Sequence, residues 1–254
     1  MTEPKLDFGG RSALVTGAGS GIGAAVARWL DAHGIETLHL VDIKADGIEA
    51  LDLGCTVHAH IHDVSDPQFW GGFERLAGKL DHAVVNAGIG SGGQIAEQSF
   101  EDWRRVMAVN LDGAFLTLAA ALRLMRANGK GSAVVTSSIT AIKPVAGIGA
   151  YGVAKAGVAH MARIAAAENA ALGIRVNAVA PGGVDTAIWE SGEAFREAVA
   201  AHGREAAIAA MGGTTPRGRF ATADEIACDI GYLLSDMSAN VTGVVLNTDG
   251  GYSL

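Results

Sequence analysis

A tyrosine and a lysine four residues apart, Tyr151 and Lys155 in the stretch YGVAK, are suited to acid–base chemistry. The surrounding sequence predicts a helix, on which residues at i and i+4 share a face. An ammonium beside a phenol favours the phenolate, so we expect Lys155 to lower the pKa of Tyr151 toward neutral pH. Ser138 lies 13 residues upstream at the end of a predicted strand, where its hydroxyl could hold a substrate oxygen. A Tyr–Lys pair alone is more typical of a solvated helix face.

A glycine-rich loop at 16–23 indicates a phosphate site. It lies between an apolar strand at 12–16 and a predicted helix at 22–33. Glycines there allow a sharp turn and a close approach of the backbone to a pyrophosphate, whose charge sits at the helix N-terminus. The spacing is G-x-x-x-G-x-G, and an ordinary strand–helix turn is the alternative. The residues expected to contact a dinucleotide are Gly17, Ser20, Gly21, Ile22 and Gly23.

Asp42 ends the next predicted strand, 19 residues after Gly23. An acidic residue at about this distance typically bonds the 2′-hydroxyl of a cofactor ribose. Its carboxylate would repel the extra phosphate of NADP, and neither Ile43 nor Ala18 supplies a cation to accept that phosphate. Lys44 is the one nearby cation. The sequence therefore favours NAD over NADP as the cofactor; the alternative is that Asp42 caps the strand–helix turn.

Short apolar segments alternate with longer helical ones along the chain. This alternation predicts an α/β fold: a Rossmann-type doubly wound parallel sheet with helices on both faces, in a single domain over 1–254. Segment 186–220 is helix-prone and is interpreted as a substrate-loop insertion, not a second domain. The expected strands are 12–16, 37–42, 57–62, 83–86, 132–138, 175–180 and 244–247, and the expected helices are 22–33, 100–127, 149–172 and 222–234.

Composition excludes several classes of protein. The 254 residues are 49% hydrophobic and carry a net charge of −8, which argues against nucleic acid and anionic membrane as partners. We find no uninterrupted apolar stretch of the roughly 18 residues that a membrane span needs, and expect a cytoplasmic protein. Cys55 and Cys228 form no CxxC pattern. Alternating histidines at 58, 60 and 62 resemble metal ligands, but side chains along one strand rarely converge on one ion, so no metal is expected.

Taken together, these motifs resemble those of short-chain dehydrogenases/reductases, and the likeness covers nearly the whole chain. The resemblance implies that Asn110 interrupts its helix and holds a water linking Lys155 to solvent, and that Lys155 also bonds the nicotinamide ribose. The family commonly has a full helix between 42 and 57, which we expect here to be trimmed to a turn. The residues carrying the resemblance are the 16–23 loop, Asp63, Val64, Asn86, Ala87, Gly88, Asn110, Ser138, Tyr151, Lys155, Pro181, Gly182 and Thr186.

The same resemblance assigns the remaining contacts with the dinucleotide. Asp63 and Val64 would meet the adenine ring, and the stretch 86–88 would line the adenosine side. Pro181, Gly182 and Thr186 would contact the nicotinamide. The Val184 backbone would bond the carboxamide.

The resulting hypothesis is an NAD-dependent oxidoreductase acting on a secondary alcohol or ketone. Ser138, Ile139, Val145 and Trp189 would form an apolar pocket for a cyclic or aromatic substrate. The alternatives are an NADPH-dependent 3-ketoacyl-type carbonyl reductase and a redox sensor that binds NAD without turnover. Retention of Asn110, Ser138, Tyr151 and Lys155 argues against the sensor. The resemblance also implies a homodimer or homotetramer formed through the small residues of helices 100–127 and 149–172, which could otherwise pack within one subunit.

Overall fold

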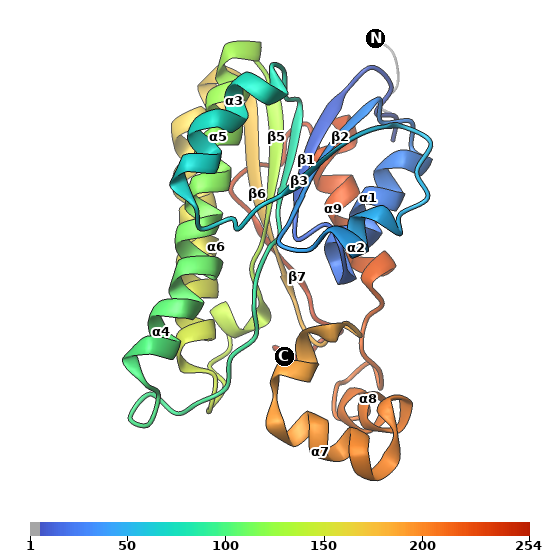
Figure 1. The fold of residues 1–254 in the computed structure, drawn as a ribbon, viewed down its shortest axis with the longest axis vertical. Helices are drawn as coiled ribbons and strands as arrows, with labels where there is room; N and C mark the ends of the chain where they lie inside the picture. The colour runs from blue at the N-terminus through green and yellow to red at the C-terminus, as the bar shows by residue number, and fades with distance from the viewer. Residues whose placement is uncertain (1–5) are drawn as a thin grey trace.

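A seven-stranded parallel sheet forms the centre of the molecule (Figure 1). The computed structural model describes residues 6–254, so residues 1–5 of the predicted domain lie outside the description. The strand order is β3-β2-β1-β4-β5-β6-β7, and every neighbouring pair is parallel. This confirms the doubly wound sheet. The strands are β1 (Ser12–Thr16), β2 (Thr37–Asp42), β3 (Thr56–Ile61), β4 (His82–Val85), β5 (Gly131–Thr136), β6 (Ile174–Pro181) and β7 (Val245–Thr248).

Helices cover both faces of this sheet (Figure 1). On one face lie α1 (Gly21–Ala32), α2 (Ala45–Glu49) and α9 (Ala223–Leu234). On the other lie α3 (Pro67–Ala77), α4 (Phe100–Met107), α5 (Gly113–Asn128) and α6 (Gly149–Asn169). Two further helices, α7 (Glu193–His202) and α8 (Arg204–Gly212), project beyond the sheet from segment 186–220, which we call the substrate loop.

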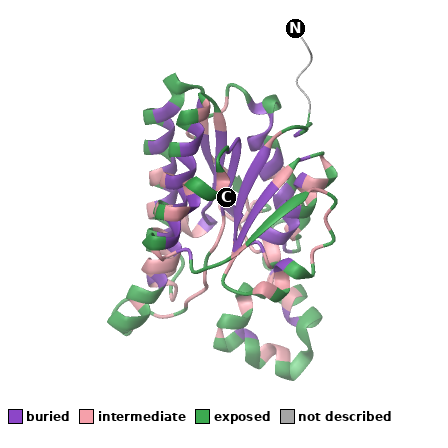
Figure 2. Ribbon diagram, turned by 45° about the horizontal axis from the view of Figure 1, so that its top comes forward, coloured by how far each residue is buried: buried purple, intermediate pink, exposed green. Residues whose placement is uncertain are grey.

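The core consists of two apolar layers, one on each face of the sheet. Along β1, Leu14 faces the layer under α3, α5 and α6, whereas Ala13 and Val15 face the layer under α1 and α9. This alternation follows from the two-residue period of a strand. Burial of both faces explains why central strands such as β1, β4 and β5 read as nearly continuous apolar runs. Figure 2 shows the buried central strands between helices whose outer faces are exposed, while the edge strand β3 is itself exposed.

The helix expected at 100–127 is interrupted by a π-helical turn at Ala108–Asp112 that contains Asn110, as the family resemblance implied. The structure differs from the expected helices in two places. The segment expected to be a turn after β2 forms the five-residue helix α2. Helix α3 was not expected, because two glycines in its middle weaken its helical pattern. A signal for it was present: Asp66 caps the helix and proline occupies its first turn.

One helical stretch, Phe100–Asn128, is long and apolar enough by length and composition to cross a membrane, contrary to the expectation above. Half of its most apolar window is buried in the fold, where α5 packs against α3, β4 and β5. The burial accounts for its apolar character, as in the core helix of a folded domain.

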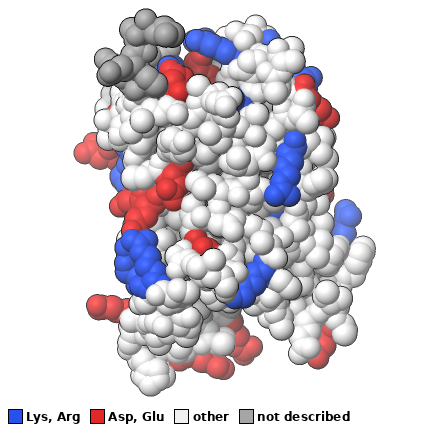
Figure 3. Space-filling view, turned by 180° about the vertical axis from the view of Figure 1, so that it is seen from behind, with Lys and Arg blue, Asp and Glu red and all other residues white. Residues whose placement is uncertain are grey.

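On the face shown in Figure 3, acidic and basic side chains are interspersed among wide uncharged areas.

Candidate active site

Four strands end at one edge of the sheet, and the candidate site residues follow them directly. We call this the carboxyl edge. The glycine loop follows β1, the stretch 86–88 follows β4, Ser138 follows β5, and Pro181 ends β6. In open parallel sheets, ligands bind at this edge, beside the point where the strand order reverses. Here that point lies between β1 and β4.

The loop after β1 leaves no room for side chains at its glycines. Gly17 and Gly21 have φ angles of 65° and 51°, in the left-handed region that favours glycine. A Cβ on Gly23 would overlap the Gly17 carbonyl oxygen. Ser20 caps α1 without a side-chain hydrogen bond, so its hydroxyl and the first N–H groups of the helix stay available to a ligand. These features fit a cradle for a pyrophosphate.

Asn86 fixes this loop against β4. Its side-chain Nδ2 donates to the Thr16 carbonyl oxygen at 3.0 Å, while the Thr16 hydroxyl accepts from the backbone N–H groups of Asn86 and Ala87 at 3.0 and 3.1 Å. A Cβ on Gly17 would come within 2.9 Å of the Ala87 Cα. The backbones of the 16–23 loop and of residues 86–87 are thus in direct contact. This close approach explains the glycine at position 17 and the amide side chain at position 86.

Asp42 lies beside the same loop. Its carboxylate accepts from the Gly19 N–H at 2.9 Å and from the Lys44 N–H at 3.2 Å. The carboxylate therefore stabilises the turn, as the alternative interpretation held, and adds negative charge at the cofactor loop. Asp63 and Val64 follow β3, next to the end of β2. Asp63 is exposed and accepts from Ser65, whereas Val64 is buried.

Ser138, Tyr151 and Lys155 come together at the carboxyl edge. Ser138 is 7% exposed, and its hydroxyl lies near enough to the Tyr151 phenol to act on the pKa of that group. Its Oγ also accepts from the Thr140 N–H at 3.2 Å. Lys155 is 4% exposed, and its Nζ donates to the Thr136 carbonyl oxygen at 2.8 Å while lying 5.7 Å from the centroid of the Tyr151 ring. Ser138 lies in the turn after β5, Tyr151 and Lys155 lie on α6, and the arrangement of the three suits proton exchange on a substrate oxygen.

The expected lowering of the pKa of Tyr151 by Lys155 is wrong for this arrangement. Burial raises the pKa of Tyr151, and its hydrogen bond with Ser138 opposes the rise only in part. Burial also lowers the pKa of Lys155 to about 8, because the ammonium is shielded from water. Helical spacing correctly placed both residues on one face, but it could not account for the cost of desolvating them.

Asn110 lies within the π-helical turn and is 1% exposed. Its Oδ1 accepts from the Ile89 N–H at 2.8 Å and its Nδ2 donates to the Ile89 carbonyl oxygen at 2.9 Å. The side chain thus fixes the loop after β4. A Cβ on Gly88 would lie 3.2 Å from Asn110 Oδ1 and 3.3 Å from Lys155 Nζ, which places Gly88 between the two groups. The water expected at Asn110 stays a prediction.

Segment 181–186 runs from β6 across the glycine loop. A Cβ on Gly21 would lie 3.1 Å from Thr186 Cγ2, and one on Gly182 would lie 2.9 Å from the Asp249 Cα. Val184 is buried and forms a bridge with Ala221. The residues assigned to the nicotinamide end and those assigned to the phosphates therefore lie next to each other.

The expected substrate residues are not equivalent in the structure. Ile139 is only 3% exposed, whereas Val145 lies on an exposed loop between β5 and α6. Trp189 stacks on Phe220, with ring centroids 5.1 Å apart, and its Nε1 donates to the Val184 carbonyl oxygen at 2.8 Å. Sequence analysis did not identify Phe220 as part of the site; its isolated position at the end of the substrate loop gave no periodic signal.

The alternating histidines lie next to a further histidine of β2. His58 and His60 both stack on His39, and His39 Nδ1 lies 3.3 Å from His60 Nε2. His62 stacks instead on Phe69 of α3. Within residues 6–254, no group of three or more His, Cys, Asp or Glu side chains is arranged to hold a metal ion. The rings form an aromatic contact with α3 at the edge of the sheet.

Comparison with known proteins establishes the family. A family model described as enoyl-(acyl carrier protein) reductase matches residues 17–253. Levodione reductase of Leifsonia aquatica is 35% identical over 266 residues, covering 99% of this chain and 97% of that protein. This chain belongs to the short-chain dehydrogenase/reductase family. Its relatives are oxidoreductases, and it is an oxidoreductase of the same kind that uses a nicotinamide cofactor.

Three further comparisons describe individual relatives of this short-chain dehydrogenase/reductase. The cis-4-hydroxycyclohexanecarboxylate dehydrogenase of Sinomonas cyclohexanicum is 39% identical over 254 residues, covering 97% of this chain and 98% of that protein. The crystal structure of levodione reductase has a TM-score of 0.89 at 33% identity, covering 97% of this chain and 98% of that one. A putative 2-deoxy-D-gluconate 3-dehydrogenase from Agrobacterium tumefaciens, solved with bound NADP, has a TM-score of 0.85 at 34% identity, covering 99% of each chain.

Proposed function

We propose that the protein is an NAD-dependent dehydrogenase of a cyclic secondary alcohol, or a reductase of the matching ketone. The observation that carries the proposal is the meeting of Ser138, Tyr151 and Lys155 at the same edge of the sheet as a glycine loop that turns tightly into the uncapped N-terminus of α1. A non-catalytic NAD-binding sensor would need the loop but not the buried hydroxyl–phenol–ammonium group.

The preference for NAD rests on Asp42. Its carboxylate accepts a hydrogen bond from the Gly19 N–H, in the loop that would receive the adenosine end of the cofactor. The negative 2′-phosphate of NADP would be repelled by this carboxylate, which would weaken the binding of NADP. The size of the loss depends on how far the carboxylate can turn away. Lys44 is the neighbouring cation, but its side chain is on an exposed residue. The NADP found in the Agrobacterium relative makes the NADPH-dependent reductase the alternative to test.

The protein residues handle the proton of the reaction. The bound dinucleotide supplies the hydride chemistry at its nicotinamide ring. In the oxidation direction, Tyr151 Oη accepts the hydroxyl proton and Ser138 Oγ holds the substrate oxygen by a hydrogen bond. Burial raises the pKa of Tyr151 in the protein alone. The positive charge of Lys155, whose Nζ lies 5.7 Å from the centroid of the phenol ring, and that of a bound oxidised nicotinamide would both oppose this rise. Asn110 holds the loop that brings Gly88 between itself and Lys155.

The proposed substrate class follows from the chemistry around Ser138 and from the relatives. Val145 lies on the loop between Ser138 and Tyr151 and is 38% exposed, which leaves an apolar side chain available near the site. Two relatives act, by their names, on compounds with a hydroxycyclohexane or levodione skeleton. A cyclic ketone or alcohol with a mainly apolar ring is the class that these features favour.

The test is a comparison of cofactors and of Tyr151 variants. Cyclohexanol, 4-hydroxycyclohexanecarboxylate and a short 3-ketoacyl thioester are each assayed with both nucleotides by absorbance of the reduced cofactor. We expect turnover of the cyclic alcohols with NAD, and a fall of about 10²–10⁴-fold in kcat for Tyr151→Phe. Faster turnover of the thioester with NADPH would support the alternative function, and full activity of Tyr151→Phe would exclude the proposed role of the phenol.

We also propose a homodimer or homotetramer formed through α5 and α6. Phe115 of α5 is 57% exposed, and Val153 and Ile164 of α6 are 45% and 49% exposed. Val153 and Ile164 are eleven residues apart, so they lie on one face of the helix. Exposed apolar side chains of this size on a helix pair are typical of a protein interface. Light scattering of the purified protein tests the assembly.

A further inference from the structure

We propose that Trp189 is a positioning residue for the cofactor: it holds the Val184 backbone in the form that receives the nicotinamide end and thereby makes the substrate loop part of the cofactor site. This inference rests on the proposed function. The indole Nε1 donates to the Val184 carbonyl oxygen at 2.8 Å. Nothing in the spacing of the sequence links a tryptophan of the substrate loop to this peptide.

The backbone around Val184 is held by Trp189, near the start of the substrate loop, and by Ala221, the residue that follows the loop. The Gly183 carbonyl oxygen accepts from the Ala221 N–H at 2.9 Å, and the Asp185 N–H donates to the Ala221 carbonyl oxygen at 3.0 Å. With the indole bond to Val184, three consecutive residues are fixed by segments that begin and end the loop. Because each bond is to a different backbone group, the segment cannot rotate a single peptide without breaking one of them.

The backbone N–H of Val184 has no partner within residues 6–254, although Val184 is the buried residue of segment 183–186. Val184 is 6% exposed. Its carbonyl oxygen has two lone pairs, of which Trp189 uses one. A buried backbone N–H is almost always paired, so an unpaired one at the carboxyl edge indicates a place for a ligand acceptor. The indole bond determines the direction in which the adjoining carbonyl points.

Trp189 is itself fixed by aromatic packing. Its ring stacks on Phe220 with an interplanar angle of 16°, and Phe220 in turn lies against Gly183, where a Cβ would overlap its ring. Trp189 and Phe220 come from the two ends of the substrate loop. The stack therefore closes the base of the loop directly on the segment that it positions.

Arg204 also links the substrate loop to the segment 183–186, through an ion pair with Asp185. Arg204, at the start of α8, lies 2.7 Å from Asp185 Oδ1 and 3.8 Å from Glu190 Oε1, and also donates to the Thr186 carbonyl oxygen at 3.4 Å. Thr186 packs against Gly21 of the glycine loop. The segment 183–186 thus joins the substrate loop to the phosphate end of the cofactor site.

The decisive experiment replaces the indole while keeping an aromatic ring. Trp189→Phe retains a ring to stack on Phe220 and removes only the donor to Val184. Calorimetric titration of the full-length protein with NAD, without substrate, gives the Kd. Loss of one neutral hydrogen bond predicts a rise in Kd of about fivefold. The KM for NAD should rise similarly with kcat within about twofold, since the bond acts on a group that binds cofactor in ground and transition state alike.

A matched control is Trp103→Phe, in α4 and away from the segment. It is expected to leave the Kd unchanged. A purely structural role for Trp189 would lower the melting temperature of the nucleotide-free protein and leave the Kd within twofold of the parent value, which overturns the inference. A tighter Kd overturns it too, because the indole would then be competing with the cofactor.

A second pair of variants decides the matter if Trp189→Phe does not fold. Arg204→Gln removes the ion pair with Asp185, whereas Arg196→Gln removes an arginine that donates only to carbonyl oxygens within the substrate loop. We expect a higher Kd for NAD in Arg204→Gln than in Arg196→Gln, and equal values overturn the inference. Failure of the parent protein to bind either nucleotide would instead contradict the proposed function.

Discussion

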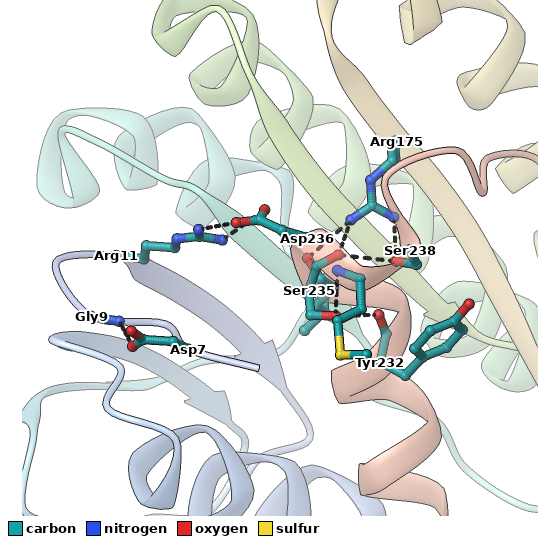
Figure 4. Close-up of polar contacts among 10 residues, drawn as sticks. Asp7, Gly9, Arg11, Arg175, Tyr232, Ser235, Asp236 and Ser238 are labelled. Carbon is teal, nitrogen blue, oxygen red and sulfur yellow. Dashed lines mark hydrogen bonds and ion pairs between the residues drawn. The ribbon is translucent and has the colours of Figure 1, made fainter. Parts of the chain in front are cut away.

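His82 makes the protein sensitive to acid from the end of the sheet opposite the active site. The side chain begins β4, is 4% exposed, and has no hydrogen-bond partner in residues 6–254 for either ring nitrogen. It packs edge-on against Phe8 at 5.1 Å. Burial lowers its pKa to about 3, and the positive charge of Arg11 acts in the same direction, while Asp81 and Asp236 oppose it. Figure 4 shows the Arg11–Asp236 pair in this region.

The size of the effect follows from the two pKa values of His82. The folded protein keeps the ring neutral down to about pH 3, whereas the unfolded chain, with an ordinary pKa of 6.5, takes up a proton as the pH falls below that value. The unfolded state then binds more protons, so the free energy of unfolding falls with pH. Between pH 7 and pH 5 the loss from His82 is about 2 kcal/mol. This loss depends only on the pKa of His82 in the unfolded chain, because the His82 ring of the folded protein is still neutral at pH 5.

The assay compares His82→Leu with the parent by urea denaturation at pH 7 and pH 5. Leucine has nearly the volume of histidine and cannot titrate. The free energy of unfolding of the variant minus that of the parent should therefore be about 2 kcal/mol larger at pH 5 than at pH 7. His39, whose pKa burial lowers to about 4, destabilises parent and variant equally in acid and cancels in the comparison. His202→Gln, on an exposed residue of α7, is the control. An equal difference between parent and His82→Leu at both pH values would refute the reasoning.

Three further outcomes are expected. Gly23→Ala should abolish NAD binding in calorimetry, because the methyl group would overlap the glycine loop, whereas Gly71→Ala, with open space around it, should bind normally. Asp42→Asn keeps an acceptor for the loop and removes the charge, so the ratio of kcat/KM for NAD to that for NADP should fall by at least about tenfold; an unchanged ratio would remove the basis for NAD preference. Asn110→Ala leaves the backbone of Ile89 unpaired and should lower the free energy of unfolding by about 1–3 kcal/mol in urea titrations, together with kcat.

Much of the fold follows from local patterns in the sequence. Apolar runs such as 12–16 and 37–42 became β1 and β2 with the expected bounds, because a strand buried on both faces needs apolar residues throughout. Helix bounds were also close where caps are strong, as at Thr222, which forms a capping box with Glu225. The missed helix α3 shows the converse. Its cap was present at Asp66, but glycines at 71 and 72 broke the periodic signal, and packing of Trp70 and Phe73 in the core overrides that weakness.

The site divides in the same way between spacing and packing. Spacing alone places Tyr151 and Lys155 on one face of α6, whereas the direction of their pKa shifts depends on how deeply the fold buries them. Likewise, Trp189 could be recognised as an apolar residue of the substrate loop, but its stack on Phe220 joins residues 31 positions apart in the chain. A tryptophan held in that stack, with its N–H already bonded to Val184, presents less surface to a substrate than a free one would. The substrate selectivity of this enzyme should therefore depend more on the loop between Ser138 and Tyr151 than on Trp189, whose contacts are directed at the cofactor segment.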